Sequence, residues 1–199
     1  MEHSVILDGL NARQSDAVTS NSPHVLVLAG AGSGKTKVLV HRVAWYLETG
    51  QALPSSVLAV TFTNKAATEM RHRIRNLTDS DTDSMWVGTF HNIAHRILRH
   101  HWKEAGLKQR FQIIDSDDQL RLIKRLIKDS GFKDEEVAPK EAQWFINNRK
   151  DRGERPEQID DYADQNFLNM VKVYKLYEQA CQRAGLVDFA ELLLSATEL

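Results

Sequence analysis

The segment at residues 24–36 constrains this chain more than any other part of its sequence. An apolar, β-branched run at 25–28 is followed by a loop of small residues, 29–34, and then by a helical pattern that begins at Lys35. Glycines in the loop allow its backbone to curl closely around an anion, and the unpaired N–H groups at the start of a helix attract negative charge. This order of strand, loop and helix is typical of a phosphate-binding loop, with Ala29 in place of the usual first glycine.

Two side chains at the end of this loop carry the chemistry. Lys35 supplies a cation for the β- and γ-phosphates of a nucleotide, and the hydroxyl of Thr36 can bind Mg²⁺. A glycine-rich turn without a ligand is the alternative, but the Gly-Lys-Thr sequence at this offset from a predicted strand disfavours it. We therefore predict a site for a nucleoside triphosphate.

The composition is that of an ordinary globular protein. The chain has 199 residues, of which 42% are hydrophobic and 27% charged, and no apolar run approaches the roughly 20 residues of a membrane span. Residues 1–4 lack the basic start and apolar stretch of a signal peptide. The single cysteine, Cys181, excludes a disulfide framework and continues an apolar helical series, so we expect it in a core. We expect a cytoplasmic protein with no membrane partner.

The net charge of −1 hides an uneven distribution of charged residues. Residues 65–110 contain nine Lys or Arg, five Asp or Glu and five of the eight histidines, whereas residues 151–199 contain ten Asp or Glu and five Lys or Arg. A basic middle and an acidic end fit a protein that touches a polyanion with one region. Ordinary solvated helix faces would give the same charges, so both interpretations stay open.

Up to about residue 90, predicted strands and helices alternate. We predict strands at His24–Leu28, Val57–Phe62 and Met85–Val87, and helices at 11–20, 35–48 and 64–77. Strands that are separated by helices pair in parallel through right-handed crossovers. The first part of the chain is therefore predicted to be α/β with a parallel sheet.

Beyond residue 90, nearly all predicted elements are helices, the first of them at about 90–102. The other helix signals are a capping box at Ser116–Gln119, Pro139 before a helix at 140–150, Gly185 after a helix at 166–183, and Asp188 with Glu191 as caps of a last helix.

Residues 111–115 resemble an apolar strand that ends in an acid, which a phosphate loop needs for Mg²⁺. Polar Gln112 interrupts this run, however, and Asp115 and Ser116 stand directly before a helix. We interpret Asp115 and Ser116 as cap residues.

Asn11 and Gln14, just before the phosphate loop, have the spacing of a helix capping pair. A glutamine amide can also read the edge of adenine, because it offers one acceptor and one donor. Both interpretations of Gln14 stay open.

Two segments follow predicted strands and carry candidate contacts with a nucleic acid. They are Phe62, Thr63, Asn64 and Lys65, and Gly88, Thr89, Phe90 and His91. Since parallel strands bring their carboxyl ends to one edge, these residues fit contacts with phosphates and bases. In the alternative, Thr63 is only a cap, Phe62 lies in the core and His91 is structural.

Four of these segments occur in the order of the motifs of UvrD/Rep/PcrA-type DNA helicases, which essentially the whole chain resembles. Leu10–Gln14 matches the Q motif of that family, Ala29–Thr36 its motif I, Thr61–Ala67 its motif Ia and Gly88–His91 its motif Ib. Gly185–Phe189 resembles the segment shortly before its acidic motif II. Four motifs in order make the resemblance far more specific than the phosphate loop alone.

The resemblance implies an α/β fold of the P-loop NTPase class. It implies a RecA-like parallel sheet, incomplete in this chain, at residues 1–90 (subdomain 1A), followed by an all-helical inserted subdomain (1B) at 91–199. The implied contacts with ATP and Mg²⁺ are Gln14, Ala29, Gly30, Ala31, Gly32, Ser33, Gly34, Lys35, Thr36 and Lys37, with Thr36 as the metal ligand. The implied contacts with DNA are Phe62, Thr63, Asn64, Lys65, Gly88, Thr89, Phe90 and His91. Lys37 departs from the family pattern, which more often has Arg there.

The implied activity is that of an ATP-dependent DNA helicase that moves 3′ to 5′ on single-stranded DNA and unwinds duplexes in repair and replication. The implied partners are single-stranded DNA, junctions of single and double strands, and DNA repair proteins. The resemblance places the acidic motif, the water-positioning Glu and the arginine finger outside these 199 residues. We therefore expect the chain by itself to be inactive.

Two other functions stay open from the sequence. A small P-loop phosphotransferase would need Asp115 as its magnesium-binding acid and would leave Phe62–Lys65 and His91 unexplained. A non-enzymatic module would use the helical part to bind duplex DNA or a repair partner.

Overall fold

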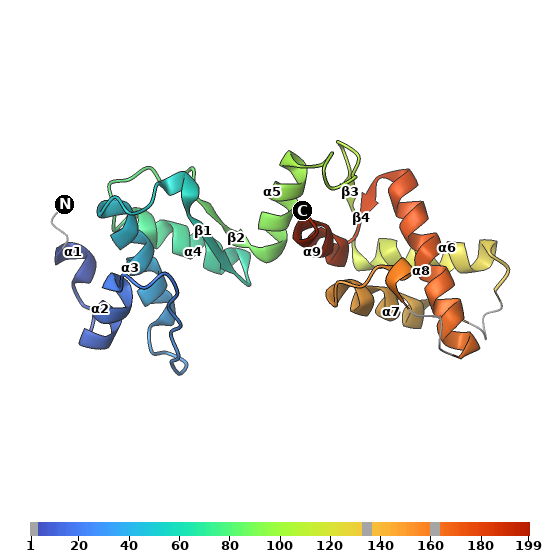
Figure 1. The fold of residues 1–199 in the computed structure, drawn as a ribbon, viewed down its shortest axis with the longest axis horizontal. Coiled ribbons are helices and arrows are strands. Elements are labelled where there is room, and N and C mark those ends of the chain that lie inside the picture. Colours follow the sequence, from blue (N-terminus) through green and yellow to red (C-terminus); the bar gives the residue numbers. More distant parts are fainter. Residues whose placement is uncertain (1–3, 133–136, 160–163) are drawn as a thin grey trace. The chain divides into compact units, whose positions relative to one another are not determined.

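Figure 1 shows the computed structural model, which describes residues 4–132, 137–159 and 164–199. The chain forms two compact units, Met1–Ile93 and Ala94–Leu199. Within the described ranges, no helix is both long enough and apolar enough to cross a lipid bilayer.

The first unit combines helices with a short parallel sheet. Its elements are α1 (Ser4–Leu7), α2 (Ala12–Thr19), α3 (Lys35–Glu48), η1 (Pro54–Ser56), β1 (Leu58–Thr61), α4 (Asn64–Arg75), β2 (Trp86–Thr89) and the first turn of α5 (Phe90–His100). β1 and β2 pair in parallel with Thr61 opposite Thr89, so the two strands end at the same level. The helix α4 connects them, as predicted for a parallel crossover.

One apolar cluster packs α3 and α4 with this sheet. Its buried side chains are Val40, Val43, Leu47, Ala59, Met70, Ile74, Met85 and Val87. Full burial of a side chain such as Ile74 or Met85 contributes roughly 1.5–3 kcal/mol. The cluster therefore holds α3 and α4 against this sheet.

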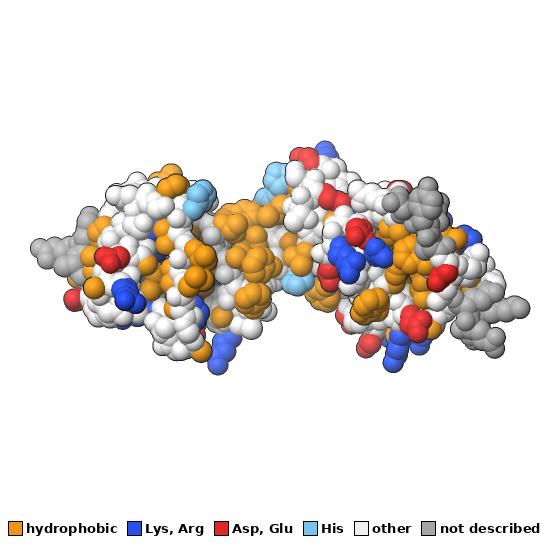
Figure 2. Space-filling view, turned by 60° about the horizontal axis from the view of Figure 1, so that its bottom comes forward, with side chains coloured by type: hydrophobic (Ala, Val, Ile, Leu, Met, Phe, Trp, Pro, Cys, Tyr) orange, Lys and Arg blue, Asp and Glu red, His pale blue; other side chains and the backbone are white. Residues whose placement is uncertain are grey.

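The strand predicted at His24–Leu28 is wrong, because the structure assigns these residues to no strand. Leu26 and Leu28 are 82% and 85% exposed, and hydrophobic side chains reach the surface of this unit (Figure 2). A strand forms only where a neighbour satisfies its backbone groups. Among the described residues, β1 and β2 pair only with each other, so 24–28 has no neighbouring strand.

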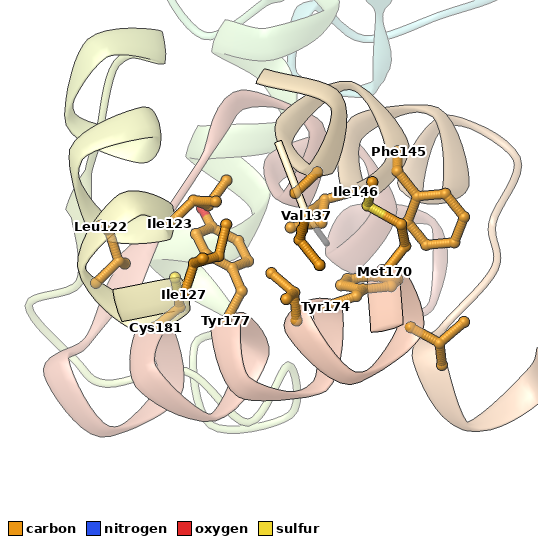
Figure 3. Close-up of a cluster of buried hydrophobic side chains, with 13 residues drawn as sticks. Leu122, Ile123, Ile127, Val137, Phe145, Ile146, Met170, Tyr174, Tyr177 and Cys181 are labelled. Carbon is orange, nitrogen blue, oxygen red and sulfur yellow. The ribbon is translucent and has the colours of Figure 1, made fainter. Parts of the chain in front are cut away.

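The second unit is almost entirely helical. Its elements are the rest of α5, β3 (Gln112–Ile113), α6 (Ser116–Asp129), α7 (Pro139–Asp151), η2 (Pro156–Gln158), α8 (Gln165–Ala184), β4 (Leu186–Val187) and α9 (Phe189–Thr197). Helices α6, α7 and α8 enclose a core that contains Ile123, Ile146 and Tyr174 (Figure 3). Cys181 lies in this core, as predicted, and its burial raises the pKa of the thiol to about 12.

β3 and β4 form a second parallel pair, which the sequence did not predict. Gln112 lies opposite Leu186, and Ile113 lies opposite Val187. Two residues per strand are too few for a recognisable alternation of apolar and polar positions.

The cap of α6 differs from the prediction by one residue. Asp115 is the N-cap, since its carboxylate accepts hydrogen bonds from the backbone N–H groups of Asp117 and Asp118. Ser116 is already helical, so the capping box predicted at Ser116–Gln119 is wrong and Asp115 alone is confirmed as the cap.

The other helix ends of this unit agree better with the sequence. Pro139 is the first residue of α7, and Gly185 follows α8 in the left-handed conformation with φ 72°. Asp188 caps α9 by accepting a hydrogen bond from the N–H group of Glu191. The side chain of Glu191, which was predicted as a second cap, instead enters a buried ion-pair network.

That network joins α7, α8 and α9. The side chain of Lys150 is 1% exposed, and its Nζ lies 2.7 Å from Glu178 and 2.7 Å from Glu191. Asp188 is 2.9 Å from the same ammonium group. Arg155 contacts Glu178 and Glu191, each at 2.8 Å. The loss of one partner would leave a buried charge unpaired, which is strongly destabilising.

Candidate functional site

The phosphate-binding loop predicted from the sequence leads directly into α3. Gly34 is the N-cap of this helix with φ 88°, and Gly32 has φ 74°. Both angles lie in the left-handed region that favours glycine. The first backbone hydrogen bond of α3 runs from Val38 N to Gly34 O, so the N–H groups before it stand at the positive end of the helix.

The ammonium group of Lys35 lies inside this loop. Its Nζ donates hydrogen bonds to Ala29 O at 2.8 Å and to Gly30 O at 2.7 Å. The hydroxyl of Ser33 also donates to Gly30 O, at 2.7 Å. Thr36 is exposed at the start of α3. The loop therefore brings a cation, a helix start and an exposed hydroxyl together, which suits the phosphates of a nucleotide and Mg²⁺.

Gln14 connects the cap of α2 with the phosphate-binding loop. Its Oε1 accepts a hydrogen bond from Asn11 N at 3.0 Å, and its backbone N donates to Asn11 Oδ1 at 2.9 Å. The capping pair is thus confirmed. The Nε2 group of Gln14 also donates to Ser33 O at 3.1 Å. A contact between Gln14 and adenine stays a prediction.

Two cations on α3 hold the preceding segments against the helix. Lys37 Nζ donates to Gly9 O at 2.6 Å, so this side chain fastens the turn between α1 and α2. Arg42 donates to Ala17 O at 2.6 Å. Arg42 and Lys35 also line a pocket of about 420 Å³ beside Val25 and Val27. Arg42 was not among the predicted site residues, because it lies after motif I.

At the edge of the sheet, two phenylalanines lie side by side. Phe62 follows the last residue of β1 and Phe90 follows the last residue of β2, and the level ends of the strands bring their ring centroids to 5.9 Å. Phe62 is 90% exposed and Phe90 is 47% exposed. The interpretation of Phe62 as a core residue is therefore wrong. Thr63 is a cap, as proposed in the alternative, since its hydroxyl accepts a hydrogen bond from Ala66 N.

The remaining candidates at this edge occupy the first turns of α4 and α5. Asn64 and Lys65 begin α4 and are exposed, and His91 is exposed in the first turn of α5. Gly88 is buried, and a Cβ atom there would lie 3.3 Å from the side chain of Ile93. Glycine at this position thus lets α5 start close to β2.

Asn92 belongs to this edge although it was not among the predicted residues. Its Nδ2 donates to Asn64 Oδ1 at 2.8 Å, and its backbone N donates to Thr89 Oγ1 at 3.3 Å. The available signal was its position three residues after Thr89, at the start of a helix.

No acidic metal site accompanies these residues in the described part of the chain. There, no group of three or more His, Cys, Asp or Glu side chains could hold a metal ion. The carboxylate of Asp115 accepts hydrogen bonds from the backbone N–H groups of Asp117 and Asp118, so it caps α6.

A small-residue loop that opens a helix, with a lysine ammonium inside it, is typical of the P-loop class of nucleotide-binding proteins. Comparison with protein families narrows this class. The model of the UvrD/REP helicase N-terminal domain matches residues 10–199, so the chain belongs to this family and has its P-loop helicase fold.

Curated relatives agree with this family. The chain is 55% identical over all 199 residues to DNA helicase II of Escherichia coli strain K12, and 52% identical to DNA helicase II of Haemophilus influenzae. It is 38% identical to the ATP-dependent DNA helicase PcrA of Leuconostoc citreum. The chain spans 27–28% of the length of these relatives.

Proposed function

We propose that this chain is the ATP- and DNA-binding beginning of an ATP-dependent DNA helicase. The observation that carries the proposal is the Lys35 ammonium group inside a glycine-rich loop at the start of α3. Residues 1–90 would form the first part of the RecA-like ATP-binding subdomain, and residues 91–199 would form the helical subdomain.

In the proposed nucleotide site, Lys35 binds the β- and γ-phosphates, and the loop from Ala29 to Gly34 directs backbone N–H groups at them. Thr36 holds Mg²⁺, which when bound withdraws charge from the phosphates. Gln14 reads the adenine edge while its capping bond to Asn11 keeps the amide in place. Lys37 keeps the turn at Gly9 against α3.

In the proposed DNA site, single-stranded DNA passes along the edge where β1 and β2 end. Phe62 and Phe90 offer exposed ring faces on which bases stack. Thr63, Asn64, Lys65, Gly88, Thr89 and His91 contribute donors and charge for the backbone of the strand.

The whole protein is proposed to translocate 3′ to 5′ on single-stranded DNA and to unwind duplexes during repair and replication. Its partners would be single-stranded DNA, junctions of single and double strands, and DNA repair proteins, in the cytoplasm. A phosphotransferase is less well supported, because the carboxylate that it would need for Mg²⁺, that of Asp115, caps α6.

A chimera tests the proposal. This chain would replace the N-terminal 28% of E. coli DNA helicase II, to which it is 55% identical. The chimera is expected to hydrolyse ATP when single-stranded DNA is present. Lys35→Ala is expected to reduce that turnover by about a hundredfold or more, because charge stabilisation dominates phosphoryl transfer.

The matched control is Lys172→Ala, which removes an exposed lysine from α8. This variant is expected to hydrolyse ATP at the unsubstituted rate. Near-normal DNA-stimulated turnover of the Lys35→Ala chimera would contradict the proposed nucleotide site.

A further inference from the structure

The bridge between Asn64 and Asn92 crosses from one strand end to the other. Asn64 is the first residue of α4 and Asn92 lies in the first turn of α5, and β1 and β2 end level just before them. The distance from Asn92 Nδ2 to Asn64 Oδ1 is 2.8 Å, and both side chains are exposed. An exposed asparagine that forms a hydrogen bond loses side-chain entropy, and it gains little stability because water would satisfy the same groups. A role in binding would explain why two exposed asparagines are bridged at this edge.

In the observed direction, from Asn92 Nδ2 to Asn64 Oδ1, the bridge leaves the NH₂ end of the Asn64 amide facing outward. A side-chain amide has one acceptor oxygen and one NH₂ group with two donors. When Asn64 Oδ1 accepts the bond from Asn92, the NH₂ group of Asn64 must point elsewhere. Rotation of the Asn64 amide by half a turn would set two NH₂ groups against each other. The Asn92 backbone N is itself tied to Thr89, which holds the bridging side chain in place.

The surroundings of Asn64 favour an anion as the partner of its NH₂ group. Asn64 stands in the first turn of α4, where the helix dipole is positive, and exposed Lys65 follows it. Phe62, two residues earlier, offers a stacking surface for a base. A phosphate oxygen next to a stacked base fits this combination.

We propose that Asn92 is a positioning residue that holds the Asn64 amide with its NH₂ group toward a phosphate of single-stranded DNA. The inference rests on the proposed function and adds a residue to its DNA site. Asn92 acts only through Asn64, and this distinguishes it from a direct DNA contact.

The test measures the affinity of the 199-residue chain for a fluorescently labelled oligo(dT) by anisotropy. Asn64→Ala is expected to weaken binding about tenfold, because it removes a hydrogen bond to a charged group. Asn92→Ala is expected to weaken binding by about threefold, since the Asn64 amide is then free to rotate. Asn92→Asp is expected to have the larger effect, because a carboxylate only accepts hydrogen bonds and draws the NH₂ group of Asn64 inward.

Two matched variants separate this effect from charge and from folding. Asn76→Asp places the same new charge at the opposite end of α4 and is expected to leave binding nearly unchanged. The double variant Asn64→Ala with Asn92→Ala is expected to bind like Asn64→Ala alone, because the role of Asn92 is lost with its partner. Thermal unfolding of each variant is expected to stay close to that of the unsubstituted chain, as both side chains are exposed.

The outcomes distinguish the inference from the proposed function. Additive losses in the double variant would mean that Asn92 contacts DNA directly, which overturns the positioning role. Normal binding by both Asn92 variants, with weak binding by Asn64→Ala and Phe62→Ala, would overturn the inference and leave the DNA site standing. If the unsubstituted chain binds no oligonucleotide, or if Phe62→Ala and Asn64→Ala bind normally, the proposed DNA site itself fails.

Discussion

At the scale of single residues, Phe62 most clearly separates a binding role from a structural one. Because its side chain is 90% exposed, its truncation removes little buried surface. Stacking of a base on an aromatic ring contributes roughly 1–3 kcal/mol. We expect Phe62→Ala to weaken single-stranded DNA binding by about that amount and to leave ATP binding without DNA unchanged. Anisotropy with a labelled oligonucleotide and with a labelled ATP analogue measures the two affinities, and thermal unfolding of the same samples measures stability.

The matched control is Phe111→Ala, which truncates a phenylalanine that is 1% exposed. This variant is expected to lose roughly 3–5 kcal/mol of stability, as is usual for a buried phenylalanine. If Phe62→Ala destabilises the chain to the same degree while its folded fraction binds DNA normally, the contact role of Phe62 is wrong.

The sequence predicted those residues whose partners are close along the chain. Asn11 with Gln14, Thr63 with Ala66 and the left-handed Gly185 all follow from local spacing. Asn92 was missed, because its partner Asn64 lies one strand and one helix away. Spacing rules describe a single helix or turn, whereas this bridge depends on the level ends of two strands.

At the scale of elements, acid titration is expected to loosen the contact between α7, α8 and α9. Burial opposes ionisation of Glu191, but the adjacent Lys150 and Arg155 outweigh it and lower the pKa of Glu191 from 4.5 to about 2. A depression of this size corresponds to about 3 kcal/mol of stability. That contribution is present above pH 4.5 and is lost as the pH falls through about 2.

Glu191→Gln is therefore expected to destabilise the chain at neutral pH by about 3 kcal/mol and to flatten the acid limb of its stability curve. Urea unfolding followed by circular dichroism across the acid range measures both. Glu178 provides the contrast, because burial raises its pKa, with a further contribution from Glu191 that Lys150 opposes. Because the pKa of Glu178 is raised in the folded chain, its ionisation at neutral pH lowers the free energy of unfolding. Glu178→Gln is therefore expected to lose less stability than Glu191→Gln. Equal losses in the two variants would contradict this assignment.

Helices were more predictable than strands for a physical reason. A helix satisfies its backbone within one segment, and α3 has the bounds that its sequence pattern predicts. A strand depends on a neighbour, so the apolar run at His24–Leu28 gave a wrong prediction, and the pair of β3 with β4 was missed. The Lys150 network was also not predicted from the sequence, because its members come from separate helices.

At the scale of the whole molecule, we expect the 199-residue chain alone to hydrolyse ATP at least about a hundredfold more slowly than the chimera. This expectation follows from the prediction that the acidic motif and the arginine finger lie outside these residues, since phosphoryl transfer depends on both. A coupled assay for released phosphate, with and without single-stranded DNA, compares the two proteins at equal concentration. Turnover by the chain within about tenfold of the chimera would show that a residue of this chain supplies the acid, and would revive the phosphotransferase.

The chain's organisation into an α/β part and a helical part followed from its sequence more directly than the contacts that hold each part together. Strand and helix patterns alternate up to residue 90, and almost only helix patterns follow. Such patterns extend over long segments, so a single residue hardly changes them. The pocket lined by Lys35 and Arg42 depends instead on how α3 lies beside residues 23–27.

The burial of Lys150 has a practical consequence for chemical labelling. Amine-reactive reagents modify unprotonated, accessible lysines, and this ammonium is enclosed by three carboxylates that raise its pKa against the effect of burial. Acylation of Lys150 therefore requires the helices around it to separate first. Mass spectrometry of the peptide that contains Lys150 would thus report how often the helical unit opens. The acylation rate of the exposed Lys172 would serve as the internal reference.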